Sequence, residues 1–288
     1  MSLTAIGIIG IIILVVFLFT NMPVGFVMGF VGFLGFSYIK GFGPGLSIMA
    51  KDVFEVFSSY GLTVVPLFVF MGQLSFYSGI SRRLYDSAYV LLGSRRGGLA
   101  MATVSACTAF GAVCGSSPAT AATMATVALP EMKRYRYSME LGCGSVAAGG
   151  SLGMLIPPSV VFIIYGIMTE QSIGKLLVAG MIPGILLAGA YAGTILAWVK
   201  INPKLAPVRP EAVTWSDKAR SLLGVWEPLS LFLIVMGGIY LGIFTPTEAG
   251  AVGATALFLL ALAKRRLTRD NLVAALSESV RISVMVLF

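Results

Sequence analysis

The sequence predicts an all-α protein that crosses a membrane several times. Of its 288 residues, 57% are hydrophobic and only 11% are charged, whereas soluble domains carry about 25% charged residues. Apolar runs such as Leu3–Phe19 and Leu176–Val199 are long enough for a helix to cross a bilayer. We therefore expect a polytopic helical membrane protein.

The composition excludes several classes of function. The chain has no histidine, so it lacks a Ser-His-Asp triad and histidine-ligated transition metals. It has no GxxxxGK[ST] motif for ATP hydrolysis either. The net charge of +8 is explained by basic loops rather than by a nucleic-acid partner. We expect no enzyme activity, and we expect the cysteines to be small packing residues, namely Cys107, Cys114 and Cys143.

The first third of the chain divides into spans and connectors. Spans over 3–19 and 23–39 are separated at TNMP, whose asparagine and proline favour a turn. Segment 47–59 places apolar and charged residues on opposite sides of a helix, which is typical of an interfacial arm helix. A third span covers 62–79, and a basic connector, 81–98, follows it.

The middle of the chain contains two interrupted apolar segments. Segment 99–130 consists of two helices too short to span singly, joined at GSSPAT, and is expected to form a re-entrant hairpin. Segment 141–168 is interrupted at 149–159, GGSLGMLIPPS, and is expected to form a broken helix. A long span, 173–199, follows, and a basic linker with several prolines, 200–227, is expected in the cytoplasm.

The two ends of the chain show a weak internal repeat. Residues 1–199 form the first copy, and 228–288 begin a second copy with spans 228–244 and 249–263 and a closing amphipathic helix. The offset of about 224 residues pairs similar motifs, and the copies are inverted in the membrane. Inverted repeats with broken helices are typical of secondary transporters. A second hairpin would fall near position ~340 by this offset, so we expect a C-terminally truncated chain with an incomplete second repeat.

Charge placement sets the expected orientation. With the N-terminus outside, in the periplasm, 17 of the 20 Lys and Arg residues lie inside, and only Lys40, Lys51 and Lys175 lie outside. This bias is expected of a multi-pass protein of a bacterial inner membrane. It holds only if segment 99–130 enters and leaves on the same side, which independently favours a hairpin open to the cytoplasm.

The two interruptions supply the candidate site. Open backbone is tolerated in lipid only where protein or water covers it. Carbonyl and hydroxyl oxygens suit Na⁺, and the N-termini of half-helices suit an anionic group. The expected Na⁺ ligands are Gly115, Ser116, Ser117, Gly150, Ser151, Gly153 and Pro157. The expected substrate-binding residues are Ser116, Ser117, Thr120 and Ser159.

Purely structural roles also remain open for these residues. Glycine, serine and threonine also allow close packing between membrane helices. Glu248 is either a functional carboxylate within the membrane or simply the acidic first turn of a helix that starts at TPTE.

Several motifs together resemble the large membrane subunit (DctM-like) of tripartite ATP-independent periplasmic (TRAP) transporters. They are GSSPATAATMATVALPEM, GGSLGMLIPPSVVFIIYG, AGMIPGILLAG, VPLFVFMGQL and TPTEAGAVGA. The resemblance implies an elevator-type transporter in which two hairpins and two unwound helices bind Na⁺ and substrate. It also implies a small membrane subunit, a periplasmic substrate-binding protein and an organic acid anion as substrate, with Na⁺ as coupling ion and no other cofactor. The second hairpin and second unwound helix are missing here, as is a glycine that the family often carries near EMKRYRYS.

Two other functions are compatible with parts of this pattern. One is an ion-coupled organic-anion carrier that works without a binding protein. The other is an intramembrane hydrolase with Ser116 or Ser117 as nucleophile, which would need a base within hydrogen-bond reach. The sequence offers no histidine and no lysine within a span for that role.

Overall fold

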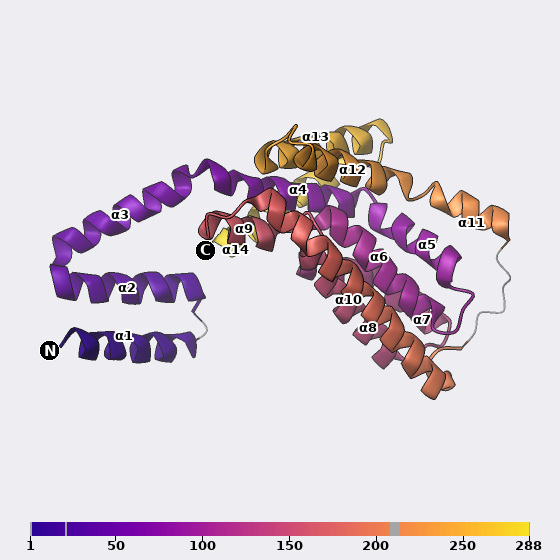
Figure 1. Cartoon of the computed structure of the whole chain (residues 1–288), viewed down its shortest axis with the longest axis horizontal. Coiled ribbons are helices and arrows are strands. Elements are labelled where there is room, and N and C mark those ends of the chain that lie inside the picture. The colour runs from indigo at the N-terminus through magenta and orange to yellow at the C-terminus, as the bar shows by residue number, and fades with distance from the viewer. Residues whose placement is uncertain (1, 21, 208–213, 288) are drawn as a thin grey trace. The chain divides into compact units, whose positions relative to one another are not determined.

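The computed structural model describes residues 2–20, 22–207 and 214–287, which form helices joined by short connections, with no strand among the described residues (Figure 1). The chain divides into two compact units. The first comprises Met1–Leu62 with Arg281–Phe288, and the second comprises Thr63–Val280.

The first unit is built from apolar helices that bury very little of themselves. Helix α1 (Leu3–Leu18) has no buried residue, and α2 (Val24–Lys40) buries only Val27. The two helices contact each other through the rings of Phe17 and Phe30, whose centroids are 6.0 Å apart. Helices that are apolar on all sides and exposed are typical of a lipid environment.

Helix α3 (Phe42–Ser58) is the expected arm helix, but it begins five residues earlier than the predicted segment 47–59. Pro44 lies in the first turn of α3, where its missing N–H would have no helical partner anyway. Gly41, with φ of 97°, makes the sharp turn between α2 and α3.

The second unit opens with two helices joined by Gly79. A 3₁₀ turn (Tyr60–Thr63) leads into α4 (Val64–Tyr77), and together they cover most of the predicted span 62–79. Helix α5 (Ile80–Leu92) was expected only as a basic connector. It is helical because apolar residues recur at helical spacing and form one buried face. These residues are Ile80, Leu84, Tyr85 and Ala88.

The core of the second unit lies among four helices that run side by side in Figure 1. They are α6 (Gly98–Cys114), α7 (Ser117–Arg134), α8 (Met139–Leu155) and α10 (Ile173–Ile201). Helix α8 packs against the other three. The largest buried side chains between them include Leu99, Met132, Leu141 and Leu152.

The predicted linker 200–227 contains more structure than expected. Helix α10 continues to Ile201, a 3₁₀ turn covers Pro203–Leu205, and α11 covers Trp215–Leu222. Residues 208–213, within the predicted linker, and Asn21, in the predicted TNMP turn, lie outside the described residues. The linker ends earlier than predicted because α12 already begins at Trp226.

The last helices are α12 (Trp226–Tyr240), α13 (Pro246–Ala263) and α14 (Arg269–Leu287). Helix α13 packs closely against α4. A Cβ at Gly253 would lie 2.8 Å from a Val235 methyl group, so this glycine allows α12 and α13 to approach each other.

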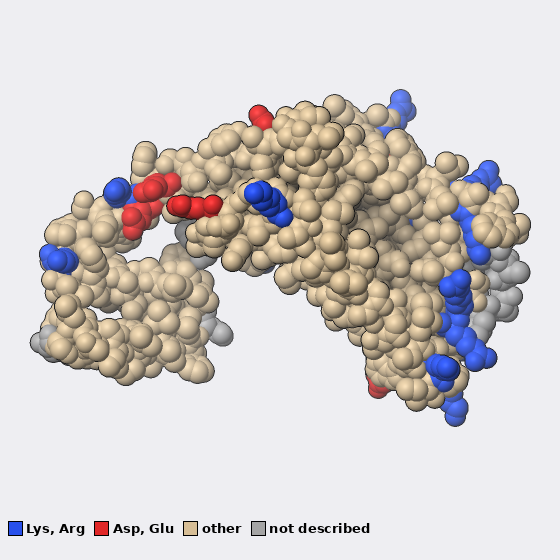
Figure 2. All heavy atoms as spheres, in the orientation of Figure 1, with Lys and Arg blue, Asp and Glu red and all other residues tan. Residues whose placement is uncertain are grey.

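Hydropathy and length agree with a membrane protein. Among the described residues, three helices are long and apolar enough to cross a membrane, or up to five if each bent helix pair counts as one span. Figure 2 shows broad surfaces without charged side chains, and a group of Lys and Arg near the end of α10. The predicted all-α polytopic class is confirmed; the inverted repeat, the re-entrance of α6–α7 and the orientation stay predictions.

The four-helix core generates a stability prediction. Leu99 is fully buried in α6, so Leu99→Ala removes packed side-chain volume and is expected to lower the free energy of unfolding by about 2–5 kcal/mol. The measurement is thermal unfolding of the purified chain in detergent. Leu186→Ala on α10, where the side chain is 68% exposed, is the control and should change stability by less than about 0.5 kcal/mol. Equal effects of the two changes would contradict the described core.

Candidate ion and substrate site

The turn between α6 and α7 is a two-residue interruption. Gly115 ends α6 with φ of 64°, in the left-handed region that favours glycine. Ser116 follows in extended conformation as the N-cap of α7, and Pro118 occupies the first turn of that helix. The sequence thus encodes a sharp reversal, and it leaves the carboxyl end of α6 and the amino end of α7 at one point.

The interruption between α8 and α9 (Val160–Met168) is shorter than predicted. Open backbone was expected over 149–159, but α8 continues to Leu155 and only 156–159 are non-helical, with a bend of 40°. The glycines of this stretch serve packing instead. A Cβ at Gly150 would lie 2.6 Å from that of Ala121, so α8 and α7 are in close contact there.

Two prolines open the end of α8. Pro157 and Pro158, joined by a cis peptide bond, carry no N–H, so they cannot close the helical hydrogen bonds to the carbonyls of Gly153 and Met154. The Ser159 hydroxyl donates to the Met154 carbonyl at 2.5 Å. The Gly153 carbonyl is left without its usual helical donor, because Pro157 carries no N–H.

The two interruptions are in direct contact. A Cβ at Gly115 would collide with the carbonyl oxygen of Pro158, and the Val160 N–H donates to the Gly115 carbonyl at 3.4 Å. The Ser117 hydroxyl donates to the Gly150 carbonyl at 2.9 Å. Segments more than thirty residues apart in sequence therefore form one local structure.

Thr120 completes this contact from the first turn of α7. Its side chain is buried, and its hydroxyl donates to the Ser116 carbonyl at 2.8 Å. Gly153 lies opposite, where a Cβ would be 2.6 Å from the Thr120 hydroxyl and 2.9 Å from the Ser116 carbonyl oxygen. The predicted tip residues thus lie beside Gly150, Gly153 and Ser159 of the helix break.

Ser151 faces a different neighbour. Its hydroxyl donates to the Ala148 carbonyl at 2.7 Å and lies 3.1 Å from the Tyr191 hydroxyl of α10. It points away from the tip because it lies on another face of α8 than Gly150 and Gly153. Its role as a Na⁺ ligand stays a prediction that this arrangement does not favour.

Glu248 takes the helix-start arrangement. Its carboxylate accepts hydrogen bonds from the Thr245 N–H at 2.8 Å and the Thr245 hydroxyl at 2.9 Å, while its own N–H donates to that hydroxyl. This is a capping box at the start of α13. Of the two interpretations that the sequence left open, the capping role is the one that the contacts display.

The electrostatics of the site come from the backbone. The carboxyl ends of α6 and α8 present carbonyls, and the amino ends of α7 and α9 present N–H groups. Segments 114–121 and 149–160 contain no charged residue. Uncharged oxygen ligands suit a monovalent cation, and the helix amino ends suit an anionic group. The described residues contain no group of three His, Cys, Asp or Glu side chains placed to hold a metal ion.

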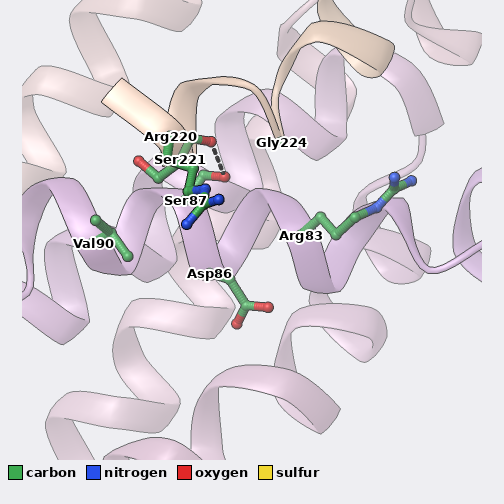
Figure 3. A pocket seen from close by; sticks show the side chains of 7 residues that line it. All are labelled: Arg83, Asp86, Ser87, Val90, Arg220, Ser221 and Gly224. Carbon is green, nitrogen blue, oxygen red and sulfur yellow. Dashed lines mark hydrogen bonds between the residues drawn. The ribbon is translucent and has the colours of Figure 1, made fainter. Parts of the chain in front are cut away.

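An open pocket of about 200 Å³ lies elsewhere, between α5 and α11 (Figure 3). Its lining includes Arg83, Asp86 and Arg220, which carry charges of both signs. The Ser87 hydroxyl donates to the Ser221 carbonyl at 2.8 Å across it. This hydrogen bond joins α5 to α11, and the pocket shares no residue with the predicted site.

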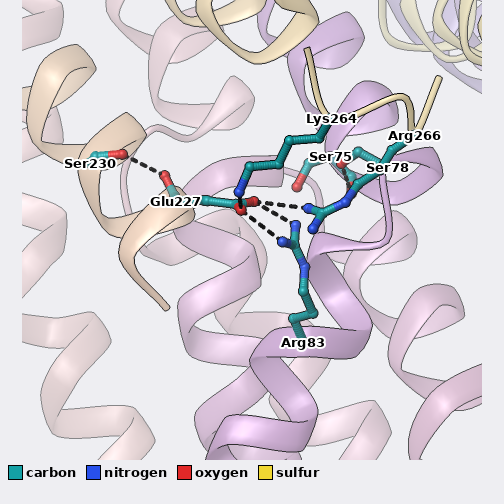
Figure 4. A network of polar contacts seen from close by, with 7 residues as sticks. All are labelled: Ser75, Ser78, Arg83, Glu227, Ser230, Lys264 and Arg266. Carbon is teal, nitrogen blue, oxygen red and sulfur yellow. Dashed lines mark hydrogen bonds and ion pairs between the residues drawn. The ribbon is translucent and has the colours of Figure 1, made fainter. Parts of the chain in front are cut away.

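One polar cluster was not predicted from the sequence. Glu227 was assigned to the end of the linker, whereas it is buried in the first turn of α12 beside three basic side chains (Figure 4). The sequence signal that could have indicated Glu227 is an acidic residue directly before an apolar run. This signal could not have identified the three basic partners, because they come from distant segments.

Comparison with known proteins identifies the family. The family described as tripartite ATP-independent periplasmic transporter, DctM component, matches residues 11–288. The chain belongs to this family. The predicted resemblance is therefore confirmed. The family is one of membrane transporter subunits, not of enzymes, and the helices of the chain agree with a multi-pass membrane protein.

Curated relatives named as TRAP transporter large permease proteins are 32–39% identical to this chain. The C4-dicarboxylate TRAP transporter large permease protein of Pseudomonas aeruginosa is 39% identical, covering 83% of this chain and 56% of the relative. The 2,3-diketo-L-gulonate protein of Escherichia coli is 34% identical, with 84% and 57% covered. The sialic acid protein of Vibrio cholerae is 32% identical, with 93% and 62% covered. The chain thus spans little more than half the length of these relatives.

The contact between the two interruptions generates a prediction. Gly115→Ala places a side chain in a left-handed conformation, at a cost of about 1–2 kcal/mol, and also against the Pro158 carbonyl. Gly79→Ala is the matched control, because Gly79 has φ of 74° and open space where a Cβ would lie. Thermal unfolding in detergent should show a larger loss for Gly115→Ala than for Gly79→Ala. Equal losses would mean that the tip and the helix break are not in close contact.

Proposed function

We propose that this chain forms part of the large subunit of a secondary transporter that imports an organic acid anion together with Na⁺. The observation that carries the proposal is the contact between the α6–α7 tip and the α8–α9 break. Four helix ends meet there, without charged side chains, in a chain of the DctM family. Half-helix ends of this kind are where secondary transporters hold ions and substrates.

Sodium is the proposed coupling ion because the available ligands are neutral oxygens. The carbonyl of Gly153 has no helical donor because Pro157 carries no N–H. The Ser116 carbonyl lies opposite Gly153. A cation bound there would use carbonyls at the carboxyl ends of α6 and α8, where the helix dipoles are negative. The proposed ligands are centred on Gly115, Ser116, Gly150 and Gly153.

The substrate is proposed to be a carboxylate-bearing anion. The amino ends of α7 and α9 offer N–H groups near Ser117 and Ser159, and such ends favour negative charge. Names of the relatives refer to C4-dicarboxylate, 2,3-diketo-L-gulonate and sialic acid, which support this class. A neutral site that binds Na⁺ first would gain positive charge and so attract the anion.

The mode of action is proposed to be an elevator motion in a bacterial inner membrane. The packed group α6–α9 would carry the site, with the N-terminus in the periplasm, and the second hairpin would come from the part of the relatives that this chain does not match. A small membrane subunit and a periplasmic binding protein are the proposed partners. Membership of the tripartite family supports both.

The test is uptake into proteoliposomes that contain a full-length complex carrying these residues. Ser117→Ala removes the hydroxyl that donates to the Gly150 carbonyl. The loss of one hydrogen bond is worth about 0.5–1.5 kcal/mol, so the Na⁺ concentration for half-maximal uptake should rise by about 2- to 10-fold. Ser58→Ala, which removes an exposed hydroxyl bonded within α3, is the control and should leave uptake unchanged.

Two results would contradict the proposal at different levels. An uptake rate that does not change when a Na⁺ gradient is imposed would contradict coupling to Na⁺, but it would not contradict organic-anion transport. Na⁺-dependent uptake with the same half-saturation in the wild type and in Ser117→Ala would retain the coupling and reject this site.

A further inference from the structure

Three basic side chains surround the carboxylate of Glu227 in the second unit (Figure 4). Arg83 approaches both oxygens, with Nη1 at 2.8 Å from Oε1 and Nη2 at 2.6 Å from Oε2. Arg266 donates from Nη1 to Oε2 at 3.2 Å, and Lys264 donates to Oε1. The Glu227 side chain is only 2% exposed. None of these residues belongs to the proposed transport site.

The cluster forms where helices begin and end. Arg83 lies in the first turn of α5, Glu227 lies in the first turn of α12, and Lys264 and Arg266 follow the end of α13. Lys264 Nζ also lies 5.0 Å from the ring centroid of Trp226. Tryptophan and basic residues at helix ends are typical of the membrane–water interface. We therefore place this cluster at the level of the lipid headgroups.

The charges of the cluster do not balance. Three cations contact a single carboxylate, so the ion pairs of Glu227 leave two positive charges uncompensated within the cluster. The cations are partly accessible, with side-chain exposures of 25% for Arg83 and 34% each for Lys264 and Arg266. Partly desolvated cations in excess of their counter-charge are costly, so a second anion would stabilise this arrangement.

Helix α4 carries a buried hydroxyl without a hydrogen-bond partner among the described residues. Ser75 of α4 is fully buried, and its hydroxyl has no hydrogen-bond partner among the described residues. Its carbonyl is already engaged by the Ser78 hydroxyl at 3.0 Å. Figure 4 draws both serines in the same view as the Arg266 and Lys264 side chains. A hydroxyl donor beside guanidinium and ammonium groups suits an oxyanion with several acceptor oxygens.

We propose that the Glu227 cluster binds a phosphate-type oxyanion, supplied by the headgroup of an anionic phospholipid. The oxyanion would be held by the accessible faces of Lys264 and Arg266 and by the Ser75 hydroxyl, while Arg83 keeps Glu227 paired. Basic sites between membrane helices at the headgroup level are suited to such lipids. This proposal does not depend on the transport site or its ion.

The experiment measures the thermal unfolding midpoint of the purified full chain in a neutral detergent. Dioleoyl-phosphatidylglycerol, dioleoyl-phosphatidylcholine or inorganic phosphate is added at matched ionic strength. A ligand that binds only the folded state raises the midpoint with concentration. We expect phosphatidylglycerol to raise it and phosphatidylcholine to leave it nearly unchanged. An equal rise with inorganic phosphate would support the oxyanion site but overturn the lipid as its source.

Variants separate this cluster from general attraction between charges. The double variant Lys264→Gln and Arg266→Gln retains the Arg83–Glu227 pair, and it should lose more than about half of the phosphatidylglycerol shift. The matched control, Lys200→Gln with Lys204→Gln, removes two exposed cations elsewhere and should keep the shift. A full shift in the cluster variant, or an equal loss in the control, would overturn the proposal.

A second measurement covers the case in which the double variant does not fold. Native mass spectrometry of the wild-type chain, released from mixed micelles with equal amounts of the two lipids, should show retained phosphatidylglycerol in excess of phosphatidylcholine. Arg266→Lys, which keeps the charge, should retain this excess. Equal retention of the two lipids by the wild type would overturn the proposal without reference to any variant.

Discussion

The need to satisfy backbone polar groups away from water governs this structure. An N–H or carbonyl without a partner in hydrocarbon costs several kcal/mol, so a helix break at membrane depth must be covered by protein. The α6–α7 tip and the α8–α9 break satisfy each other: the Ser117 hydroxyl donates to the Gly150 carbonyl, and the Val160 N–H donates to the Gly115 carbonyl. Each interruption therefore supplies hydrogen-bond partners to the other.

Small residues are what make this cover possible. Gly150 and Gly153 were interpreted from the sequence as open backbone, but they lie within α8 and permit α7 to approach it. The packing role of Gly150 and Gly153 is therefore compatible with their proposed role as Na⁺ ligands. Close approach through glycine brings the carbonyls of one helix within reach of the hydroxyls of the next, so the packing positions the proposed ligands.

Composition and local pattern predicted the helical class and the position of the tip, because apolar run length and breaker residues are local signals. The family was predicted from the resemblance of several longer motifs. The boundaries of the helix break were mispredicted, since packing by α7 decides whether Gly149–Leu155 stays helical. Ser151 could not be separated from Gly150 and Gly153 without knowing which face of α8 meets α7. Glu227 was missed because its three partners come from distant segments, and no periodicity links them.

The absence of charged side chains from segments 114–121 and 149–160 has an electrical consequence for a carrier of the proposed kind. Moving one elementary charge through a membrane potential of ~100 mV involves about 2.3 kcal/mol of work. An unloaded site made of neutral oxygens and helix ends carries no formal charge, so its return across the membrane would be almost independent of voltage. The voltage dependence of such a carrier would then come from its cargo, through the balance of bound cations and substrate anions in each loaded passage.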